Sequence, residues 1–188
     1  MVVWRSFRNG DGLAIGQNAP MITSIAEYLR WFGGVNRRAM RDVGSLPETA
    51  LDWQPGHGEG EDAWTVREIV GHMAASRAFF PHALAGHGWR MDPNLPDLTD
   101  VSSCVQALAD SADAVAGLVT GLDDAVLSVR FESFDDPAVT VAGWRLLMMM
   151  AEHDIHHRSQ IMTYAGINGW PVNQIFGRTY EEVLQQSR

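Results

Sequence analysis

Two histidines in the C-terminal part of the chain have the spacing of a metal-binding pair. The sequence of 188 residues contains seven histidines, and His153 and His157 lie four residues apart in a stretch of helical periodicity. Residues four apart on a helix share one face, with Cβ atoms about 5–6 Å apart. Leu146, Ile161 and Tyr164 lie on that same face, so both imidazoles are expected to point into an apolar core. An unpaired buried polar group costs about 1–3 kcal/mol, and one divalent cation bound at about 2.0–2.1 Å would satisfy both rings.

A third imidazole comes from an earlier predicted helix. Thr65 and Glu68 have the spacing of a capping box, which predicts a helix that begins there and runs to about Ala85. Pro81 is expected to kink or shorten this helix. His72 lies on the inward stripe of this helix together with Ile69. Three neutral imidazoles without a fourth protein ligand leave one coordination position open, as in catalytic zinc sites. The alternative interpretation is a core histidine that is hydrogen-bonded to a backbone carbonyl or a carboxylate.

Residues one turn away from these histidines are candidates for further roles. Glu68 precedes His72 by one turn and Gln160 follows His157 by one turn, which makes both candidate catalytic residues. The capping box already explains Glu68, and hydrogen bonding in the bundle core accounts equally well for Gln160. Five more residues are expected to line the pocket or to support the ligands: Ser76, Phe79, Met149, His156 and Tyr164.

The elements that must position these side chains are helices. Apolar residues recur at helical spacing over about 22–44, 65–85, 98–122 and 140–166, with Thr140 as the expected cap of the fourth helix. A short helix is predicted from Thr179. Residues 46–62 are expected to form a long loop, and residues 126–139 an irregular segment with room for one small hairpin. We therefore predict an all-α fold, a four-helix bundle that builds its site from facing helices. The predicted organisation is an N-terminal arm over 1–20, the metal-binding bundle over 21–170 and a C-terminal tail over 171–188.

Composition limits the class of function. The chain has 14 Lys and Arg against 23 Asp and Glu, a formal net charge of −9. This balance argues against binding to nucleic acid or to an anionic membrane surface, both of which need basic side chains. No aliphatic run approaches the ~20 residues of a membrane-spanning helix. The single cysteine, Cys104, is expected to be a buried packing residue, and a cytoplasmic location is the expectation.

Two segments resemble the DinB/YfiT-like superfamily of metalloproteins. Residues 64–72, WTVREIVGH, are similar to the family's Trp-Ser/Thr-x-x-Glu…His opening of the second helix. Residues 151–161, AEHDIHHRSQI, are similar to its His-x-x-x-His-Arg-Gly-Gln segment on the fourth helix, with Ser159 where the family usually has Gly. Residues 46–55 also match the connection between the first two helices, and the likeness spans about 22–166. The resemblance implies a four-helix bundle with His72, His153 and His157 as ligands of a divalent metal, zinc or nickel first, with iron, cobalt or manganese as alternatives. It also implies a homodimer.

The resemblance implies more than one activity. Some relatives are thiol-dependent S-transferases that use bacillithiol, mycothiol or glutathione, and one branch is a maleylpyruvate isomerase. We therefore expect a metal-dependent enzyme of stress response or detoxification, which uses a low-molecular-weight thiol against a small electrophilic substrate. The alternatives are a non-catalytic stress module that binds a metal or ligand, and a metal-hydroxide hydrolase with Glu68 or Gln160 as its base.

Overall fold

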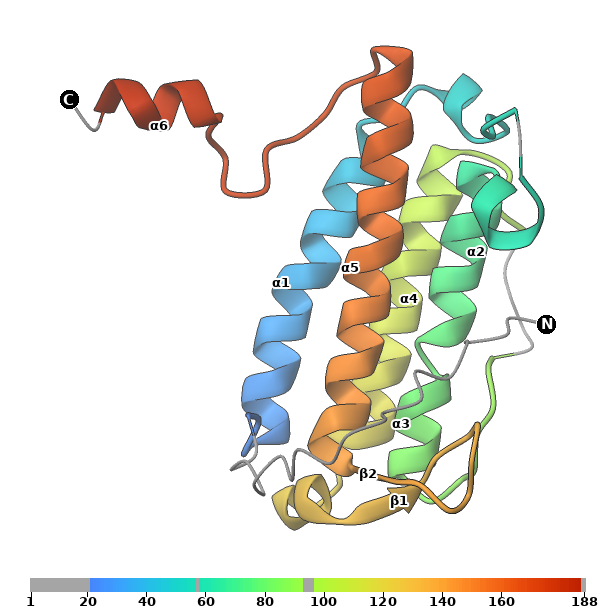
Figure 1. Cartoon of the computed structure of the whole chain (residues 1–188), viewed down its shortest axis with the longest axis vertical. Coiled ribbons are helices and arrows are strands. Elements are labelled where there is room, and N and C mark those ends of the chain that lie inside the picture. The colour runs from blue at the N-terminus through green and yellow to red at the C-terminus, as the bar shows by residue number, and fades with distance from the viewer. Residues whose placement is uncertain (1–20, 57, 93–96, 187–188) are drawn as a thin grey trace, which may run out of the picture.

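A computed structural model of the chain describes residues 21–56, 58–92 and 97–186 (Figure 1). Four helical rods form a bundle: α1 (Ile25–Gly44), α2 (Val66–Ser76) with its continuation α3 (Phe79–Leu84), α4 (Val101–Val119) and α5 (Gly143–Asn168). The smaller elements are the 3-10 turns η1 (Glu48–Ala50), η2 (Gly60–Ala63) and η3 (Asp124–Ser128), the strands β1 (Arg130–Glu132) and β2 (Thr140–Ala142), and helix α6 (Tyr180–Gln186). The predicted four-helix bundle is confirmed, with its long first connection and its short C-terminal helix. The predicted arm over 1–20 lies outside the described residues.

The rods form a ring in which α2 and α5 are neighbours. Helix α1 packs against α4 and α5, and the α2–α3 rod packs against the same two helices. In Figure 1, α1 and α5 run upwards while α2, α3 and α4 run downwards. The buried apolar side chains of all four rods fill the interior, in one cluster around Ile69, Leu108 and Ile161 and a second around Phe32 and Leu147. Side chains from the middle of α2 and of α5 therefore meet inside the bundle. Among the described residues, no helix is both long enough and apolar enough to cross a membrane.

The start of α2 and the interruption of the helix before Ala85 both follow the prediction. Thr65 caps α2, and both bonds of the capping box with Glu68 are present. The predicted helix to about Ala85 is interrupted between Ser76 and Phe79, in keeping with the kink expected from Pro81. Pro81 is the cause that the sequence supplies, because a proline has no amide hydrogen to donate to the carbonyl four residues earlier. That carbonyl belongs to Arg77, which lies in the break.

The start of α5 differs from the prediction, in which Thr140 was the cap. Thr140 instead begins strand β2, which pairs antiparallel with β1 and places Thr140 opposite Glu132. The small hairpin allowed for residues 126–139 is therefore present, and it takes in the first residues assigned to the helix. Helix α5 begins at Gly143, where an added Cβ would lie 2.3 Å from the carbonyl oxygen of Val126. Glycine is the residue that permits this close approach.

A buried ion pair joins the break after α2 to the middle of α5. Arg77 Nη2 lies 2.7 Å from Asp154 Oδ2, and both side chains are 0% exposed. Arg77 also donates to Ser111 Oγ at 2.9 Å and to the carbonyl oxygen of Leu108 on α4. Asp154 directly follows His153, so this pair fixes the rotation of α5 about its axis at the level of the histidines. Cys104 is fully buried, as expected for a packing residue, and burial raises the pKa of its thiol to about 11.

Candidate metal centre

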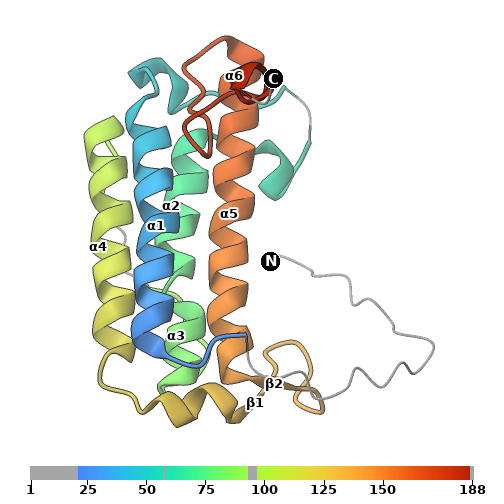
Figure 2. The ribbon, with the colours of Figure 1, turned by 90° about the vertical axis from the view of Figure 1, so that its left-hand side faces the viewer.

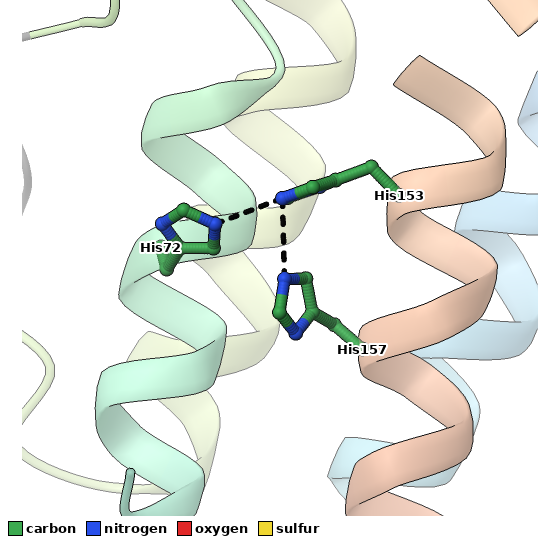
Figure 3. Close-up of side chains that lie close together, drawn as sticks. All are labelled: His72, His153 and His157. Carbon is green, nitrogen blue, oxygen red and sulfur yellow. Dashed lines mark hydrogen bonds between the residues drawn. The ribbon is translucent and has the colours of Figure 1, made fainter. Parts of the chain in front are cut away.

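Three imidazoles meet between α2 and α5 (Figure 3). The Nε2 atoms of His72 and His153 lie 2.8 Å apart, and those of His153 and His157 lie 3.1 Å apart. All three rings offer a ligand nitrogen within 4.8 Å of the others. Ligand nitrogens around a tetrahedral cation with bonds of about 2.0–2.1 Å are separated by about 3.3 Å. The observed spacing therefore needs only a small outward movement to admit a metal ion.

Gln160 determines which nitrogen of His157 carries the proton. The Gln160 amide nitrogen donates to the carbonyl oxygen of Glu61 at 3.0 Å and to the hydroxyl of Tyr164 at 3.2 Å. A backbone carbonyl only accepts, so the orientation of the amide is fixed and its Oε1 faces His157 Nδ1 at 3.1 Å. Nδ1 must therefore be the protonated nitrogen of the neutral ring. Its Nε2 presents a lone pair to the other two histidines, which is the form that ligates a metal.

The three rings cannot satisfy one another by hydrogen bonding alone. In a neutral imidazole each nitrogen is either a donor or an acceptor. With His157 Nε2 as an acceptor, the Nε2–H of His153 would have to serve both His157 and His72. One hydrogen would then be shared between two lone pairs in a largely buried place. A cation among the three nitrogens satisfies all of them, so the donor set fits a divalent metal.

The electrostatics of the cluster keep the rings neutral. Burial, followed by the proximity of His157, lowers the pKa of His72 to about 4. Burial, followed by His157 and His72, lowers the pKa of His153 to about 3. The pKa of His157 is lowered by burial, which outweighs the opposing effects of Gln160 and Glu61. All three ligand candidates are therefore neutral near pH 7, and a metal would not have to compete with a second proton on any ring.

The long loop before α2 contributes two residues that the sequence did not reveal as part of the site. Glu61, in η2, places Oε1 3.4 Å from His157 Nε2, and its side chain is 31% exposed. The same oxygen lies 3.7 Å from Nε2 of His156. Trp64 covers another side, with its ring centroid 4.7 Å from that of His72. Their sequence signals were weak, because Glu61 is one of several acids in the loop and Trp64 also fits a helix-entry staple.

The other predicted site residues are divided between the site and the rest of the bundle. Ser76 Oγ lies 3.3 Å from His72 Nε2, and Tyr164 contacts the site through Gln160. His156 is exposed, with its ring 4.9 Å from that of His157, so it flanks the cluster. Met149 is half-buried, one turn before His153 on α5. The remaining two predicted residues, Glu68 and Phe79, interact with other partners.

Glu68 and Phe79 lie in other settings. The Glu68 side chain is exposed, and its carboxylate accepts from the Thr65 amide at 2.8 Å and from the Thr65 hydroxyl at 2.9 Å. This is the capping role that the sequence also allowed. Phe79 follows the helix break and packs in an aromatic cluster with Trp89 and Phe134, each with ring centroids 5.1 Å from its own. Glu61 therefore replaces Glu68 as the carboxylate nearest to the histidines.

The chain is a helical-bundle protein with a cluster of three histidines that could hold a metal ion, and comparison with known proteins specifies the family. The family model of the DinB superfamily matches residues 34–161. The chain belongs to the DinB superfamily. No protein with a curated description matches it significantly.

Solved structures share the same fold. A DinB-like protein from Bacillus cereus ATCC 10987 has a TM-score of 0.63 and 17% identity, covering 82% of this chain and 99% of its own. YfiT from Bacillus subtilis, described as "a probable metal-dependent hydrolase with an unusual four-helix bundle topology", has a TM-score of 0.58 and 21% identity over 84% of this chain and 97% of its own. A mycothiol-dependent maleylpyruvate isomerase has a TM-score of 0.56 and 14% identity, with 86% and 67% covered. At these identities the likeness shows the fold.

Proposed function

We propose that this protein is a divalent-metal-dependent enzyme that activates a small nucleophile, with a low-molecular-weight thiol as the first candidate. The main support for the proposal is the close approach of three Nε2 atoms. That of His153 lies 2.8 Å from Nε2 of His72 and 3.1 Å from Nε2 of His157. His72, His153 and His157 would hold the ion and leave at least one position open for another ligand. Bound there, a divalent metal acts as a Lewis acid that lowers the pKa of a coordinated thiol or water.

The side chains of this protein supply the proton transfer and the positioning. Glu61 Oε1 lies beside the lone pair of His157 Nε2, so it is placed to accept the proton of a nucleophile that enters the open position. Gln160 hydrogen-bonds to both the Glu61 backbone and the His157 ring. These two bonds fix the proposed base, Glu61, in position relative to the proposed ligand, His157. Trp64 covers one side of the cluster and restricts the entry of solvent.

With a thiol as the nucleophile, the reaction needs only the thiol and the electrophilic substrate. The proton of the S–H group passes to the Glu61 carboxylate, and the sulfur attacks an electrophilic carbon of the second substrate. The bond from that carbon to its leaving group breaks, and the electron pair departs with the leaving group. Support for a thiol comes from the family's S-transferases and from the fold shared with a mycothiol-dependent isomerase.

A hydrolase is the second candidate, and Glu61 is the observation that favours it. A general base within reach of the attacking water assists a metal-dependent hydrolase by accepting the proton of that water. Neither Glu68 in its cap nor Gln160, which is not a base, meets this need, whereas Glu61 lies next to the three nitrogens. YfiT, which shares the fold, carries the description of a hydrolase.

Turnover assays with and without thiol distinguish these candidates. Protein loaded with zinc or nickel is tested against a panel of low-molecular-weight thiols with model electrophiles, and against esters and amides without thiol. We expect metal-dependent consumption of a thiol, and a loss of about 10²–10⁴-fold in kcat for Glu61→Gln, the usual contribution of a general base. Glu59→Gln, in the same exposed loop, is the matched control and should keep full activity.

Each outcome of these assays supports one candidate function and contradicts the others. Turnover without thiol would replace the transferase by the hydrolase. Metal binding without turnover in any arm would contradict both enzymes and leave a non-catalytic metal-binding module. A Glu61→Gln variant with unchanged kcat would exclude Glu61 as the base.

A further inference from the structure

A second group of possible metal ligands adjoins the three-histidine cluster and shares one residue with it. Glu61, His156 and His157 each offer a ligand atom within 4.8 Å of the other two. Glu61 Oε1 lies 3.7 Å from His156 Nε2 and 3.4 Å from His157 Nε2. The loop with η2, which carries Glu61, lies beside α5 (Figure 2). Carboxylate and imidazole are both common ligands of zinc, so these side chains form a donor set of their own.

Two acceptor atoms in this group face each other without a proton between them. The hydrogen bond to Gln160 places the proton of the neutral His157 ring on Nδ1, so Nε2 carries a lone pair. An ionised Glu61 carboxylate also only accepts. His156 Nε2, 3.7 Å from Glu61 Oε1, is too distant to donate a hydrogen bond to it. Two acceptors 3.4 Å apart repel each other, and a cation bound to both converts this repulsion into attraction.

The group extends from solvent to the buried interior. The side chain of His156 is 66% exposed and that of Glu61 is 31% exposed, whereas that of His157 is 0% exposed. Glu59, exposed in the same loop, adds a second negative charge close in sequence. Negative charges at a surface site attract divalent cations and raise the rate of their association. A hydrated ion can therefore reach His156 and Glu61 before it has lost its water.

The nitrogen that both groups share allows an ion to pass from one to the other. His157 Nε2 lies 3.4 Å from Glu61 Oε1 on one side and 3.1 Å from His153 Nε2 on the other. One lone pair binds one cation at a time, so the two groups are alternatives for a single ion. An ion bound to His157 can exchange its outer ligands for the other two imidazoles of the cluster. It then never has to enter the buried cluster without a protein ligand, which would be costly for a charge.

We propose that Glu61, His156 and His157 form a second, weaker divalent-cation site through which the metal enters and leaves the three-histidine centre. This proposal rests on the metal centre of the proposed function and adds a route of loading to it. The loading site binds more weakly because the exposed His156 side chain must be ordered each time it binds. After the ion has moved inward, Glu61 is free to act as the base.

The kinetics of metal binding to the metal-free protein test this route. Trp64, whose ring centroid lies 4.7 Å from that of His72, reports the arrival of Co²⁺ through the loss of its fluorescence in stopped flow. We expect His156→Ala to slow association and dissociation alike, by about 10-fold, the lower end of what a focusing site contributes to an association rate. The affinity should stay unchanged, because the same route serves both directions. His87→Ala, which removes an exposed histidine after α3, is the matched control and should bind at the wild-type rate.

A variant without the inner ligands tests the loading site by itself. His72→Ala/His153→Ala should keep one weak equivalent of Co²⁺, detected by calorimetric titration and removed by dialysis. Adding His156→Ala to this variant should abolish that binding. Wild-type rates in His156→Ala alone, or equal binding by the double and triple variants, would overturn the loading site and leave the metal centre intact. A wild-type protein that binds no Co²⁺ would contradict the centre itself, and the loading site with it.

Discussion

His157 donates from Nδ1 to Oε1 of Gln160 across 3.1 Å, one turn apart on α5. This bond leaves the Nε2 lone pair of His157 directed at His153 and His72. The same amide donates to the Glu61 backbone, so a single side chain orients a proposed ligand and anchors the loop that carries the proposed base. Gln160 is therefore a positioning residue of the centre.

Removing the Gln160 amide should weaken metal binding without unfolding the protein. Outer residues that orient metal-bound histidines typically contribute about 10–100-fold in affinity. We expect a loss of that size for Gln160→Leu, measured by competition with a chromophoric chelator. Gln160→Glu keeps an acceptor for His157 Nδ1 and should recover most of the affinity. Gln106→Leu, on the exposed face of α4, should bind metal like the wild type, and equal affinity in Gln160→Leu would exclude the positioning role.

Removing one partner of the Arg77–Asp154 pair should cause a large loss in the free energy of unfolding. Breaking a fully buried pair from one side leaves an uncompensated charge and costs about 3–5 kcal/mol. We expect Arg77→Met to lower the free energy of unfolding by about this amount, as measured by urea denaturation. The double variant Arg77→Met/Asp154→Leu should recover a large part of the loss.

An exposed ion pair on the same helix provides the comparison. Arg145 and Glu152 form a bridge of 2.6 Å with side chains 40% and 51% exposed. Surface pairs contribute about 0–1 kcal/mol, so Glu152→Gln should change the stability by less than that. Similar losses for Arg77→Met and Glu152→Gln would show that the buried pair is unimportant.

The metal-free protein should lose stability in mild acid because of the histidine cluster. The pKa values of His72 and His153, about 4 and about 3, lie below the value near 6.5 of an unfolded chain. The unfolded state therefore binds more protons between these values, and the free energy of unfolding falls as the pH decreases from about 6.5 toward 4. Urea denaturation of metal-free protein at a series of pH values measures this slope. His72→Gln/His153→Gln should flatten it, and an unchanged slope in that variant would contradict the assignment.

The same shifts predict that metal binding at pH 7 releases almost no protons from the ligands. Neutral imidazoles need not lose a proton before they bind the ion. Calorimetric titration in two buffers with different ionisation enthalpies should give nearly the same heat. A difference that corresponds to two or more released protons, more than one metal-bound water can supply, would show that the histidines are charged in the free protein.

The parts of the site on regular helices were predictable from the sequence, because helical periodicity fixes which side chains share a face. The capping box of Thr65 and Glu68 located the start of α2 and hence the direction of His72, and the four-residue spacing placed His153 beside His157. Pro81 indicated an interruption of the second helix, whereas the late start of α5 was missed, because a local cap competes with tertiary packing. Gly143 is required by the approach of Val126, and nothing close in sequence indicates that contact.

Glu61 was beyond prediction for a related reason. It reaches the histidines through a loop whose path is set by a hydrogen bond to Gln160, 99 residues away. No periodicity relates such positions. Asp154 illustrates the same limit, because its partner Arg77 lies 77 residues away in the break between α2 and α3.

The metal content of the protein tests the central claim most directly. Protein purified without nickel resin is analysed by elemental mass spectrometry before and after dialysis against zinc or nickel, together with His153→Ala and the matched control His156→Ala, an exposed neighbour on the same helix. The three-histidine centre predicts about one tightly held equivalent per chain in the wild type and in His156→Ala, and a loss of that equivalent in His153→Ala. A wild-type protein that holds no divalent metal, or a His153→Ala variant that retains a full equivalent, would contradict it.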